Sequence, residues 1–401
     1  MKKKVQKVVA FIVIMFSAIL VFSIVSYSPE YMYRILRYRE SDVNDYNIFP
    51  ERTIASSANP YYYEEKAMAL EDKLISYTYN GEIHEKELKK FLEDTQTTSF
   101  IIIHNDKIVF EQYYNEHSRD SINTSFSSVK SIVSLLIGIA IDEGYIENEK
   151  QSIAEYIHEF KGTPFADITI EDLLMMRSKI RYKEGYLWFG DDAKTYYMPN
   201  LRELAINDIK IDTDYEEGKF HYNNFHPLLL GIILERSTNQ SVSSFLEGKL
   251  WQKLGTEYNA SWSLDSNDSG FEKMESGLNF RTIDFAKIGS MLLHMGKWNG
   301  EEIISEDWII KSTFAKFPLN QQEYKNSLLE DIGVGYKYMW YSFENKRGGY
   351  DYFAAGKYEQ YLYISPDNNI VIVRNGIEAG NVDWWAAVLE DITNIVVEFQ
   401  D

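Results

Sequence analysis

Short β-branched runs at opposite ends of this 401-residue chain constrain its fold most strongly. Residues 101–103 and 108–110 flank the turn sequence HNDK, and YLYISPDNNIVIV repeats the design with residues 366–369 as its turn. Such pairs predict β-hairpins. Between them, residues 127–316 are mostly helical in pattern. We predict an α+β fold, in which an antiparallel β-sheet built from both chain ends is flanked by helices, with a mostly helical region inserted between its strands.

The N-terminal region carries a second pattern. Four lysines, at positions 2, 3, 4 and 7, precede a charge-free run over residues 8–29. A run of this length can cross a bilayer as a helix, and the lysines favour a cytoplasmic N-terminus. We therefore expect the fold to be preceded by one N-terminal transmembrane helix. A cleaved signal peptide, which shares the basic head and apolar core, is the alternative.

These patterns divide the chain into three parts. Residues 1–28 are expected to form a cytoplasmic basic head and transmembrane anchor. Residues 29–95 are expected to form a stalk and packing segment, helical in part over residues 64–92. Residues 96–401 are expected to form the folded domain. The expected location is the cell membrane, single-pass, with this domain extracytoplasmic, or secretion if the anchor is cut; the oligomeric state does not follow from the sequence.

Composition excludes several classes of function. A formal charge of −20 disfavours a nucleic-acid partner, because an acidic surface repels phosphates. The chain has no cysteine, which removes disulfides, thiol catalysis and cysteine-based zinc sites. None of its 7 histidines lies in an H-E-x-x-H pattern, and it has neither a glycine-rich phosphate loop nor a G-x-S-x-G elbow. We expect neither a metal nor a cofactor.

One short motif carries candidate chemistry. Ser127 is the only serine followed by a lysine three residues later, and the match, SSVK, falls where a long apolar helix begins. Residues three apart share a helix face, so the Ser127 hydroxyl and the Lys130 amine can meet. Apolar surroundings favour an uncharged amine, which can accept the serine proton, and a helix N-terminus suits negative charge. The alternative is an N-cap serine and a lysine that reaches solvent.

With this motif, the chain resembles the serine β-lactamase and penicillin-binding-protein superfamily. The resemblance is to class C β-lactamase-related hydrolases, which include esterases, D-alanyl peptidases and nylon-oligomer hydrolases. The family's S-x-x-K resembles Ser127 to Lys130, and its Y-x-N resembles Tyr222 to Asn224, which lie between a glycine turn and an amphipathic helix. The resemblance implies that Ser127 is the acylated nucleophile and Lys130 its base. It also implies that Tyr222 is the general base and proton shuttle, and that Asn224 positions Lys130 or the substrate amide.

The family's third motif, K-T-G or H-T-G, is altered. At the corresponding place the chain has Ala354, Ala355 and Gly356. The glycine leaves room for close approach of a substrate backbone, but alanine cannot hold a carboxylate as the family motif does. Lys357 is expected to face away from the site, while its backbone N–H pairs with that of Ser127 as an oxyanion hole. Gly356 and Lys357 are therefore predicted to position the substrate.

These residues together predict a membrane-anchored extracytoplasmic serine hydrolase that forms an acyl-enzyme on Ser127. Its predicted partner is a small ester, amide or peptide-like substrate. A non-catalytic penicillin-binding or cell-wall sensor module is one alternative, and a β-lactamase or D-alanyl carboxypeptidase is another. An aromatic segment with Trp188, Tyr196 and Tyr197 is expected either over the pocket or in core packing.

Overall fold

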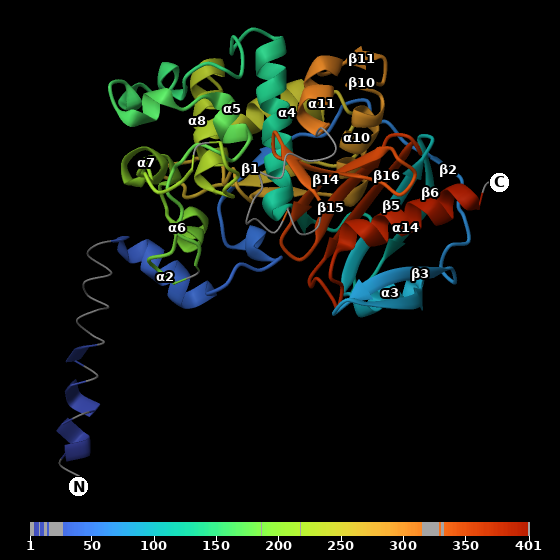
Figure 1. The fold of residues 1–401 in the computed structure, drawn as a ribbon, viewed down its shortest axis with the longest axis horizontal. Coiled ribbons are helices and arrows are strands. Elements are labelled where there is room, and N and C mark those ends of the chain that lie inside the picture. The colour runs from blue at the N-terminus through green and yellow to red at the C-terminus, as the bar shows by residue number, and fades with distance from the viewer. Residues whose placement is uncertain are drawn as a thin grey trace.

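The computed structural model describes residues 4–7, 9–11, 14–15, 27–185, 187–216, 218–314, 329 and 333–399. Its main element is an eight-stranded sheet in which strands from both chain ends lie side by side (Figure 1). In spatial order the strands are β12 (Gly335–Lys337), β13 (Trp340–Glu344), β14 (Tyr350–Gly356), β15 (Gln360–Ser365), β16 (Ile370–Gly376), β5 (Thr97–His104), β6 (Lys107–Tyr113) and β2 (Glu64–Glu65).

The two predicted hairpins form the central part of this sheet. β5 and β6 are joined by Asn105 and Asp106, which both have positive φ, as a tight hairpin turn requires. β15 and β16 pair up to Ser365 and Ile370, on either side of the predicted turn. β16 then pairs with β5, so the two chain ends meet in the middle of the sheet. The predicted α+β fold with an antiparallel sheet is confirmed; only the short edge strand β2 runs parallel to its neighbour.

Two helices cover opposite faces of the sheet. α10 (Thr282–Leu293) packs so closely that a Cβ at Gly289 would lie 2.4 Å from the side chain of Val371 on β16. α14 (Trp385–Glu398) places the ring of Trp385 4.0 Å from the guanidinium of Arg374 on the same strand. Residues 371 and 374 are an odd number of positions apart, so their side chains leave opposite faces.

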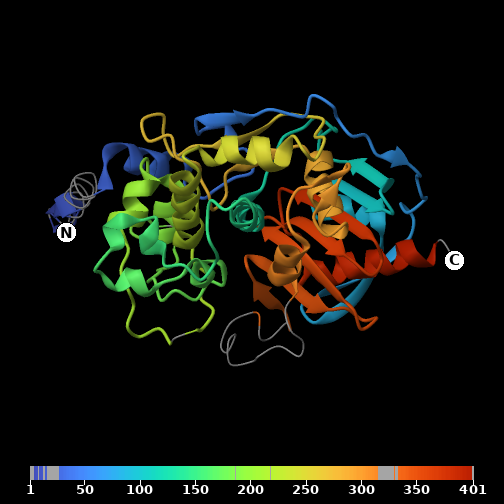
Figure 2. The ribbon, with the colours of Figure 1, turned by 90° about the horizontal axis from the view of Figure 1, so that it is seen from above.

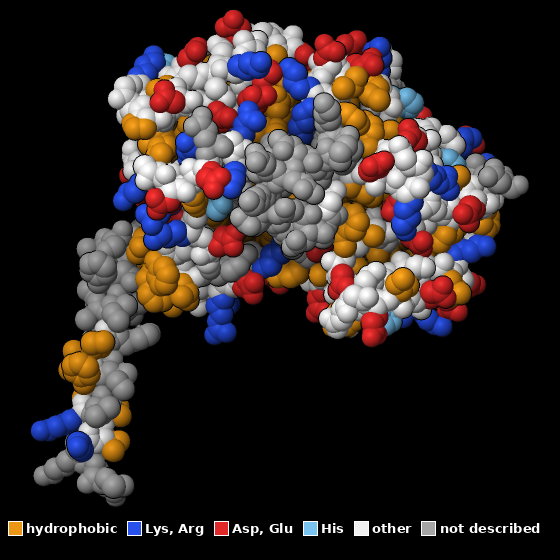
Figure 3. All heavy atoms as spheres, viewed as in Figure 1, with side chains coloured by type: hydrophobic (Ala, Val, Ile, Leu, Met, Phe, Trp, Pro, Cys, Tyr) orange, Lys and Arg blue, Asp and Glu red, His pale blue; other side chains and the backbone are white. Residues whose placement is uncertain are grey.

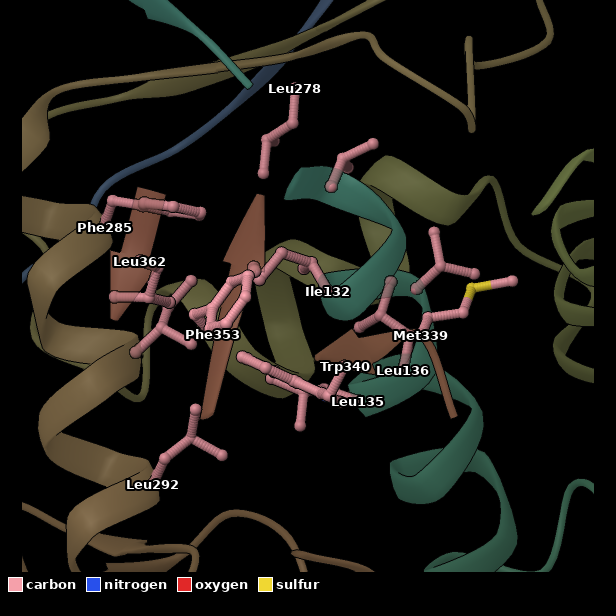
Figure 4. Packing of buried hydrophobic residues seen from close by; sticks show 14 of the residues in the cluster. Ile132, Leu135, Leu136, Leu278, Phe285, Leu292, Met339, Trp340, Phe353 and Leu362 are labelled. Carbon is pink, nitrogen blue, oxygen red and sulfur yellow. The ribbon is translucent and has the colours of Figure 1, made fainter. Parts of the chain in front are cut away.

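The inserted region is mostly helical, as predicted. Its elements include α5 (Ile170–Leu174), α6 (Asp191–Tyr197), α7 (Leu201–Glu203), α8 (Phe225–Thr238), α9 (Val242–Leu246) and α11 (Glu306–Thr313), with α4 (Val129–Asp142) preceding them. Figure 2 shows α4 end-on between this helical part and the sheet. Its side chains Ile132, Leu135 and Leu136 pack with Trp340 of β13 (Figure 4). Because α4 is buried on all sides, its N-terminus is held firmly at the junction.

A smaller sheet and two short strand pairs complete the fold. The small sheet has the order β1 (Glu51–Ile54), β8 (Ala260–Ser263), β9 (Leu278–Phe280) and β7 (Asn123–Thr124). Residues 74–87, part of the segment predicted to be helical, instead form the hairpin of β3 (Leu74–Tyr79) and β4 (Glu82–Glu87), followed by α3 (Leu88–Asp94). β10 (Lys297–Trp298) pairs with β11 (Glu301–Glu302).

The predicted N-terminal transmembrane helix is corrected. Among the described residues, no helix is long and apolar enough to cross a membrane, and near the N-terminus the described helical stretches are 4–7, 9–11 and 14–15. Residues 8, 12–13 and 16–26 of the predicted span lie outside the described residues. The location predicted for the domain stays a prediction.

The segment that follows packs onto the folded domain. α2 (Pro29–Tyr38) buries Tyr31, Met32 and Ile35 with Phe49 and with Tyr197 of α6. We call residues 29–49 the N-terminal arm. Over the face shown in Figure 3, acidic and basic side chains are interspersed. The domain boundary predicted at residue 96 stays a prediction.

Candidate active site

The predicted nucleophile lies on a strained turn at the N-terminus of α4. β7 leads into a 3-10 turn, Phe126–Ser128, in which Phe126 is buried with a φ of 45°. A bulky residue in this conformation is a genuine outlier, of a kind that clusters at functional sites. Ser127 directly follows it, so its half-buried side chain lies where the N–H groups of α4 begin.

Neighbouring serines have a different environment. Ser125 donates through its hydroxyl to the carbonyl of Ser276 (3.1 Å), Ser128 to the carbonyl of Ser125 (2.8 Å) and Ser131 to the carbonyl of Met339 (2.6 Å). These three hydroxyls are buried and already used by backbone carbonyls. The Ser127 hydroxyl instead accepts a hydrogen bond from an amine, which singles it out within this serine-rich stretch.

That amine belongs to Lys130, as the sequence predicts. Its Nζ donates to Ser127 Oγ at 2.8 Å and to the carbonyl of Glu275 at 3.1 Å, and only 2% of the residue is exposed. The lysine therefore does not reach solvent, so the alternative of an exposed lysine is wrong. Glu275 was not predicted as part of the site, because a contact made by a backbone carbonyl leaves no signature in side-chain identity.

Tyr222 is brought to the same place from the segment before α8. Its ring centroid lies 4.9 Å from Lys130 Nζ, and its side chain lines the same pocket as Ser127. Of the other Y-x-N matches, the one at residues 324–326 lies outside the described residues. The one at Tyr113 is on β6, where the tyrosine hydroxyl donates to Glu111. The structure thus assembles Ser127, Lys130 and Tyr222 as the resemblance implied.

Asn224, the N-cap of α8, has a more indirect place. Its Nδ2 donates to the hydroxyl of Tyr182 at 2.8 Å, and Tyr182 in turn donates to Asp192 at 2.6 Å. Burial raises the pKa of Tyr182 well above its usual value, so this hydroxyl stays protonated. Asn224 Oδ1 is buried without a hydrogen-bond partner among the described residues. Such an unpartnered acceptor is rare in folded proteins.

The end of β14 forms the opposite wall of the site. A Cβ at Gly356 would lie 2.3 Å from the carbonyl oxygen of Ser125 and 3.1 Å from the backbone nitrogen of Ser127. Only glycine allows this approach of strand to nucleophile. Ala354 is fully buried, whereas Ala355 and Gly356 line the pocket.

Lys357 follows directly and also contributes to the lining. Its side chain turns away, as predicted, and Nζ donates to the carbonyl and hydroxyl of Ser41, both at 3.1 Å, and to Glu40 at 3.2 Å. The N-terminal arm therefore holds the turn that carries the Lys357 backbone.

A pocket of about 410 Å³ is lined by Ser127, Tyr222, Ala355, Gly356 and Lys357. Most of its wall is aromatic or aliphatic, and three charged residues take part. This wall was not predicted from the sequence; it consists of Leu329, Val334, Tyr341, Phe353, Glu359, Tyr361, Val382, Asp383, Trp384 and Trp385. The alternation of aromatic residues along β13 to β15 was the available signal, because residues two apart share one face of a strand.

The aromatic segment expected near the site lies elsewhere. Tyr196 donates its hydroxyl to Asp45 of the arm at 2.8 Å, Tyr197 is buried against the arm, and Trp188 packs beside them. None of the three is among the pocket-lining residues of the described chain. Of the two expectations, packing is the correct one.

Comparison with known proteins fits this geometry. The sequence profile of the beta-lactamase family matches residues 85–375.

The chain belongs to the beta-lactamase family.

Individual proteins and solved structures that resemble this chain are consistent with the family assignment. A 6-aminohexanoate-dimer hydrolase of Paenarthrobacter ureafaciens is 25% identical over 309 residues, which are 72% of this chain and 74% of that protein. A structure from Bacillus anthracis, assigned as a 6-aminohexanoate-dimer hydrolase, has a TM-score of 0.72 at 22% identity. The match covers 90% of this chain and 95% of that chain. A class C beta-lactamase mutant has a TM-score of 0.55 at 12% identity, and the match covers 77% of this chain and 95% of that chain.

The beta-lactamase family assignment confirms the resemblance drawn from the motifs. It also supports the prediction of a serine hydrolase of this fold. The roles of individual residues stay predictions, which the geometry makes specific.

Proposed function

We propose that this protein is a serine hydrolase of amides or esters that forms an acyl-enzyme on Ser127. The observation that carries the proposal is the 2.8 Å hydrogen bond between the buried Lys130 amine and the hydroxyl of Ser127, which lines a pocket together with Tyr222. A nucleophile beside a base, and a base oriented by a third group, is the arrangement that activates serine. Here the third group is the carbonyl of Glu275.

In the proposed first step, Ser127 Oγ attacks the carbonyl carbon of the substrate. The amine of Lys130 takes the hydroxyl proton as the new C–O bond forms, and the proton passes by way of Tyr222 to the leaving nitrogen or oxygen. The backbone N–H groups of Ser127 and Lys357 are proposed to hold the negative oxygen, since both residues border the pocket. The original C–N or C–O bond then breaks and the amine or alcohol leaves.

The second step returns the free enzyme. Water adds to the acyl carbon and loses a proton to Tyr222 or Lys130. The bond to Ser127 Oγ then breaks, the serine regains a proton, and a carboxylic acid is released. Asn224 is proposed to hold Lys130 or the substrate amide through its unpartnered Oδ1.

Two observations favour amides and esters over β-lactams. Ala354 and Ala355 cannot hold the carboxylate of a penicillin, and the Lys357 amine is turned toward the arm. The relative from Paenarthrobacter ureafaciens is named a 6-aminohexanoate-dimer hydrolase, which is an amide-cleaving activity.

A substrate panel tests the proposal. Purified protein should hydrolyse short acyl esters or aminohexanoate dimers. Ser127→Ala and Lys130→Ala should each lower kcat by roughly 10³-fold or more, and Tyr222→Phe should lower it by roughly 10-fold or more, which is the range for such groups. Rapid turnover of nitrocefin without turnover of esters or amides would contradict the assignment of substrate class. Absence of labelling by a fluorophosphonate probe would favour the non-catalytic binding module instead.

A further inference from the structure

The turn at residues 273–277, which leads into β9, holds the segment that carries the proposed nucleophile and base. The Glu275 carbonyl accepts a hydrogen bond from the Lys130 amine at 3.1 Å. The Ser276 carbonyl accepts one from the Ser125 hydroxyl, also at 3.1 Å. The positions of the base and of the backbone that leads to the nucleophile therefore both depend on this turn.

A buried ion pair lies within the same turn. Lys273 Nζ is 3.1 Å from Glu275 Oε1, and the two side chains are only 2% and 3% exposed. The Ser276 hydroxyl donates to the same carboxylate oxygen at 2.7 Å, whereas Glu275 Oε2 is buried without a hydrogen-bond partner among the described residues. Glu275 thus binds two amines, that of Lys273 through its carboxylate and that of Lys130 through its carbonyl.

The Lys273 amine is also bound by α6 and by the N-terminal arm. It donates to the carbonyl of Tyr196, and it lies 4.0 Å from the centre of the Tyr196 ring and 4.5 Å from that of Phe49. The faces of both rings attract a cation. Burial lowers the pKa of Lys273 below its usual value, and the negative charge of Glu275 opposes that fall. The amine is held from several sides, so it fixes the place of the carboxylate that it binds.

Stability alone does not account for this ion pair. The cost of removing two charges from water offsets most of their attraction, so apolar side chains of similar volume often serve a fold equally well. Removal of one partner, by contrast, leaves an uncompensated buried charge, to which the surrounding structure must adjust. Here the surrounding structure is the turn whose carbonyl holds Lys130, so the ion pair is coupled to the base.

From these contacts we propose that Lys273 and Glu275 are positioning residues for the reaction. Their ion pair fixes the turn, and the Glu275 carbonyl then directs the Lys130 amine toward the Ser127 hydroxyl. Neither Lys273 nor Glu275 is among the residues that line the pocket in the described part of the chain, so they act through Lys130. The inference rests on the proposed hydrolase function, and it adds to that function two residues on which the rate depends.

Lys273→Met tests this dependence. The methionine fills similar space but leaves the Glu275 carboxylate unpaired, so the turn should move. A displacement of about 1 Å at the base should lower kcat by roughly 10²-fold. Because the pocket wall is unchanged, KM should change little. Steady-state kinetics with a p-nitrophenyl acyl ester measures both constants, at a temperature where melting curves show the variant to be folded.

A second substitution should restore part of the loss. In Lys273→Met/Glu275→Gln no buried charge is left unpaired, and the glutamine can still accept from the Ser276 hydroxyl. The double variant should therefore have a kcat at least roughly fivefold higher than Lys273→Met, a coupling that independent sites do not show. A double variant as slow as Lys273→Met, or slower, would overturn the proposal.

Lys287→Met is the matched control, because Lys287 forms a comparable ion pair away from the site. Its fully buried amine lies 3.1 Å from Asp284 and 3.2 Å from Glu257, and none of these three residues is in the described lining of the pocket. Lys287→Met should lower the melting temperature and leave kcat unchanged. Equal losses of kcat in Lys287→Met and Lys273→Met, or full kcat in Lys273→Met, would show that the Lys273 pair serves stability only.

A spectroscopic measurement separates this proposal from the hydrolase function. In protein labelled with ¹³C at lysine Cε, the Lys130 resonance, assigned with Lys130→Arg, should shift in Lys273→Met and stay in place in Lys287→Met. If no ester were hydrolysed but this shift were seen, the hydrolase function would fail and the positioning of Lys130 would stand. If esters were hydrolysed and the resonance stayed in place in Lys273→Met, only the positioning role would fail.

Discussion

Phe126 and Gly356 meet at the nucleophile from two sides. Phe126 is held at a φ of 45° by its burial, and its ring lies 5.5 Å from that of Tyr358 on the β14–β15 turn. Gly356 brings β14 against the backbone of Ser125 and Ser127. The position of the Ser127 hydroxyl therefore depends on close backbone packing as well as on its hydrogen bond to Lys130.

Gly356→Ala should lower kcat/KM by at least 10²-fold while the protein stays folded. The added methyl would lie 2.3 Å from the Ser125 carbonyl oxygen, so strand or turn must move by about 1 Å, and a displacement of that size costs roughly 10²-fold in rate. Steady-state kinetics and thermal melting measure the two effects.

Gly248→Ala is the matched control, because a Cβ there would meet nothing within 4 Å. It should keep full activity. Full activity in Gly356→Ala would show that the strand does not position the nucleophile.

Among single residues, side-chain identity and spacing predicted Ser127 and Lys130, whereas Tyr222 was implied by the family resemblance. The sequence could not predict the Glu275 carbonyl beside Lys130, since every residue has a carbonyl. It also missed Glu359, whose place in the pocket depends on a turn with two unusual backbone conformations.

Among the elements, the N-terminal arm is the one whose importance exceeds its expected role. It holds the β14–β15 turn through Ser41, which accepts from the Lys357 amine and from the Tyr358 hydroxyl at 2.9 Å. It also accepts from Thr124 of β7 through the carbonyl of Val43 at 3.3 Å. The arm thus contacts both the strand that leads to the nucleophile and the turn that faces it.

Lys357→Met should lower kcat/KM several-fold and make the arm more sensitive to proteolysis. The substitution keeps the backbone and the length of the side chain but removes the ammonium contacts to Glu40 and Ser41. An ion pair this exposed contributes under about 1 kcal/mol, so the melting temperature should change little.

Lys346→Met serves as the control, since its amine lies 3.9 Å from Glu390 at the opposite end of β14. Limited proteolysis and kinetics of both variants decide the matter. Unchanged kinetics and unchanged arm cleavage in Lys357→Met would refute a positioning role for the arm.

The hairpin of β3 and β4 was not predicted from the sequence. Residues 64–92 were predicted to be helical in part, but Asn80-Gly81 is a strong hairpin turn signal, and both residues have positive φ. The mixed polar and apolar pattern of these strands obscured their period, because they lie at the surface and bury only Ile75 fully.

For the whole molecule, the sheet could be predicted from the sequence because its central hairpins are continuous apolar runs with clear turns. The arrangement of the helical region could not, since it depends on packing around α4 rather than on any local pattern. The transmembrane prediction shows the limit of apolar runs as a guide: length and hydropathy permit a span but do not establish one.

Stability should fall in acid because of His226. This residue is buried in α8, with Nε2 2.6 Å from the hydroxyl of Ser178, and burial lowers its pKa to about 3 from an ordinary value of 6.5. The unfolded chain binds a proton more readily, so this contribution to stability is complete above pH 6.5 and is lost as pH falls toward 3. A tenfold change in proton affinity is worth about 1.4 kcal/mol, so the loss should be a few kcal/mol.

Urea unfolding between pH 4 and pH 7 measures this loss. The slope of stability with pH should be smaller in His226→Gln than in the wild type, whereas His117→Gln, which changes a partly exposed histidine, should leave it unaltered. An identical slope in wild type and His226→Gln would rule out this histidine as the cause.

The central claim for the molecule is that Ser127 carries the acyl group. Brief exposure to a p-nitrophenyl ester, followed by acid quench and peptide mass spectrometry, measures this directly. We predict an acyl adduct on Ser127 in the wild type, a longer-lived adduct in Tyr222→Phe, and none in Ser127→Ala. Hydrolysis that proceeds in Ser127→Ala at the wild-type rate, or an adduct on another residue, would contradict it.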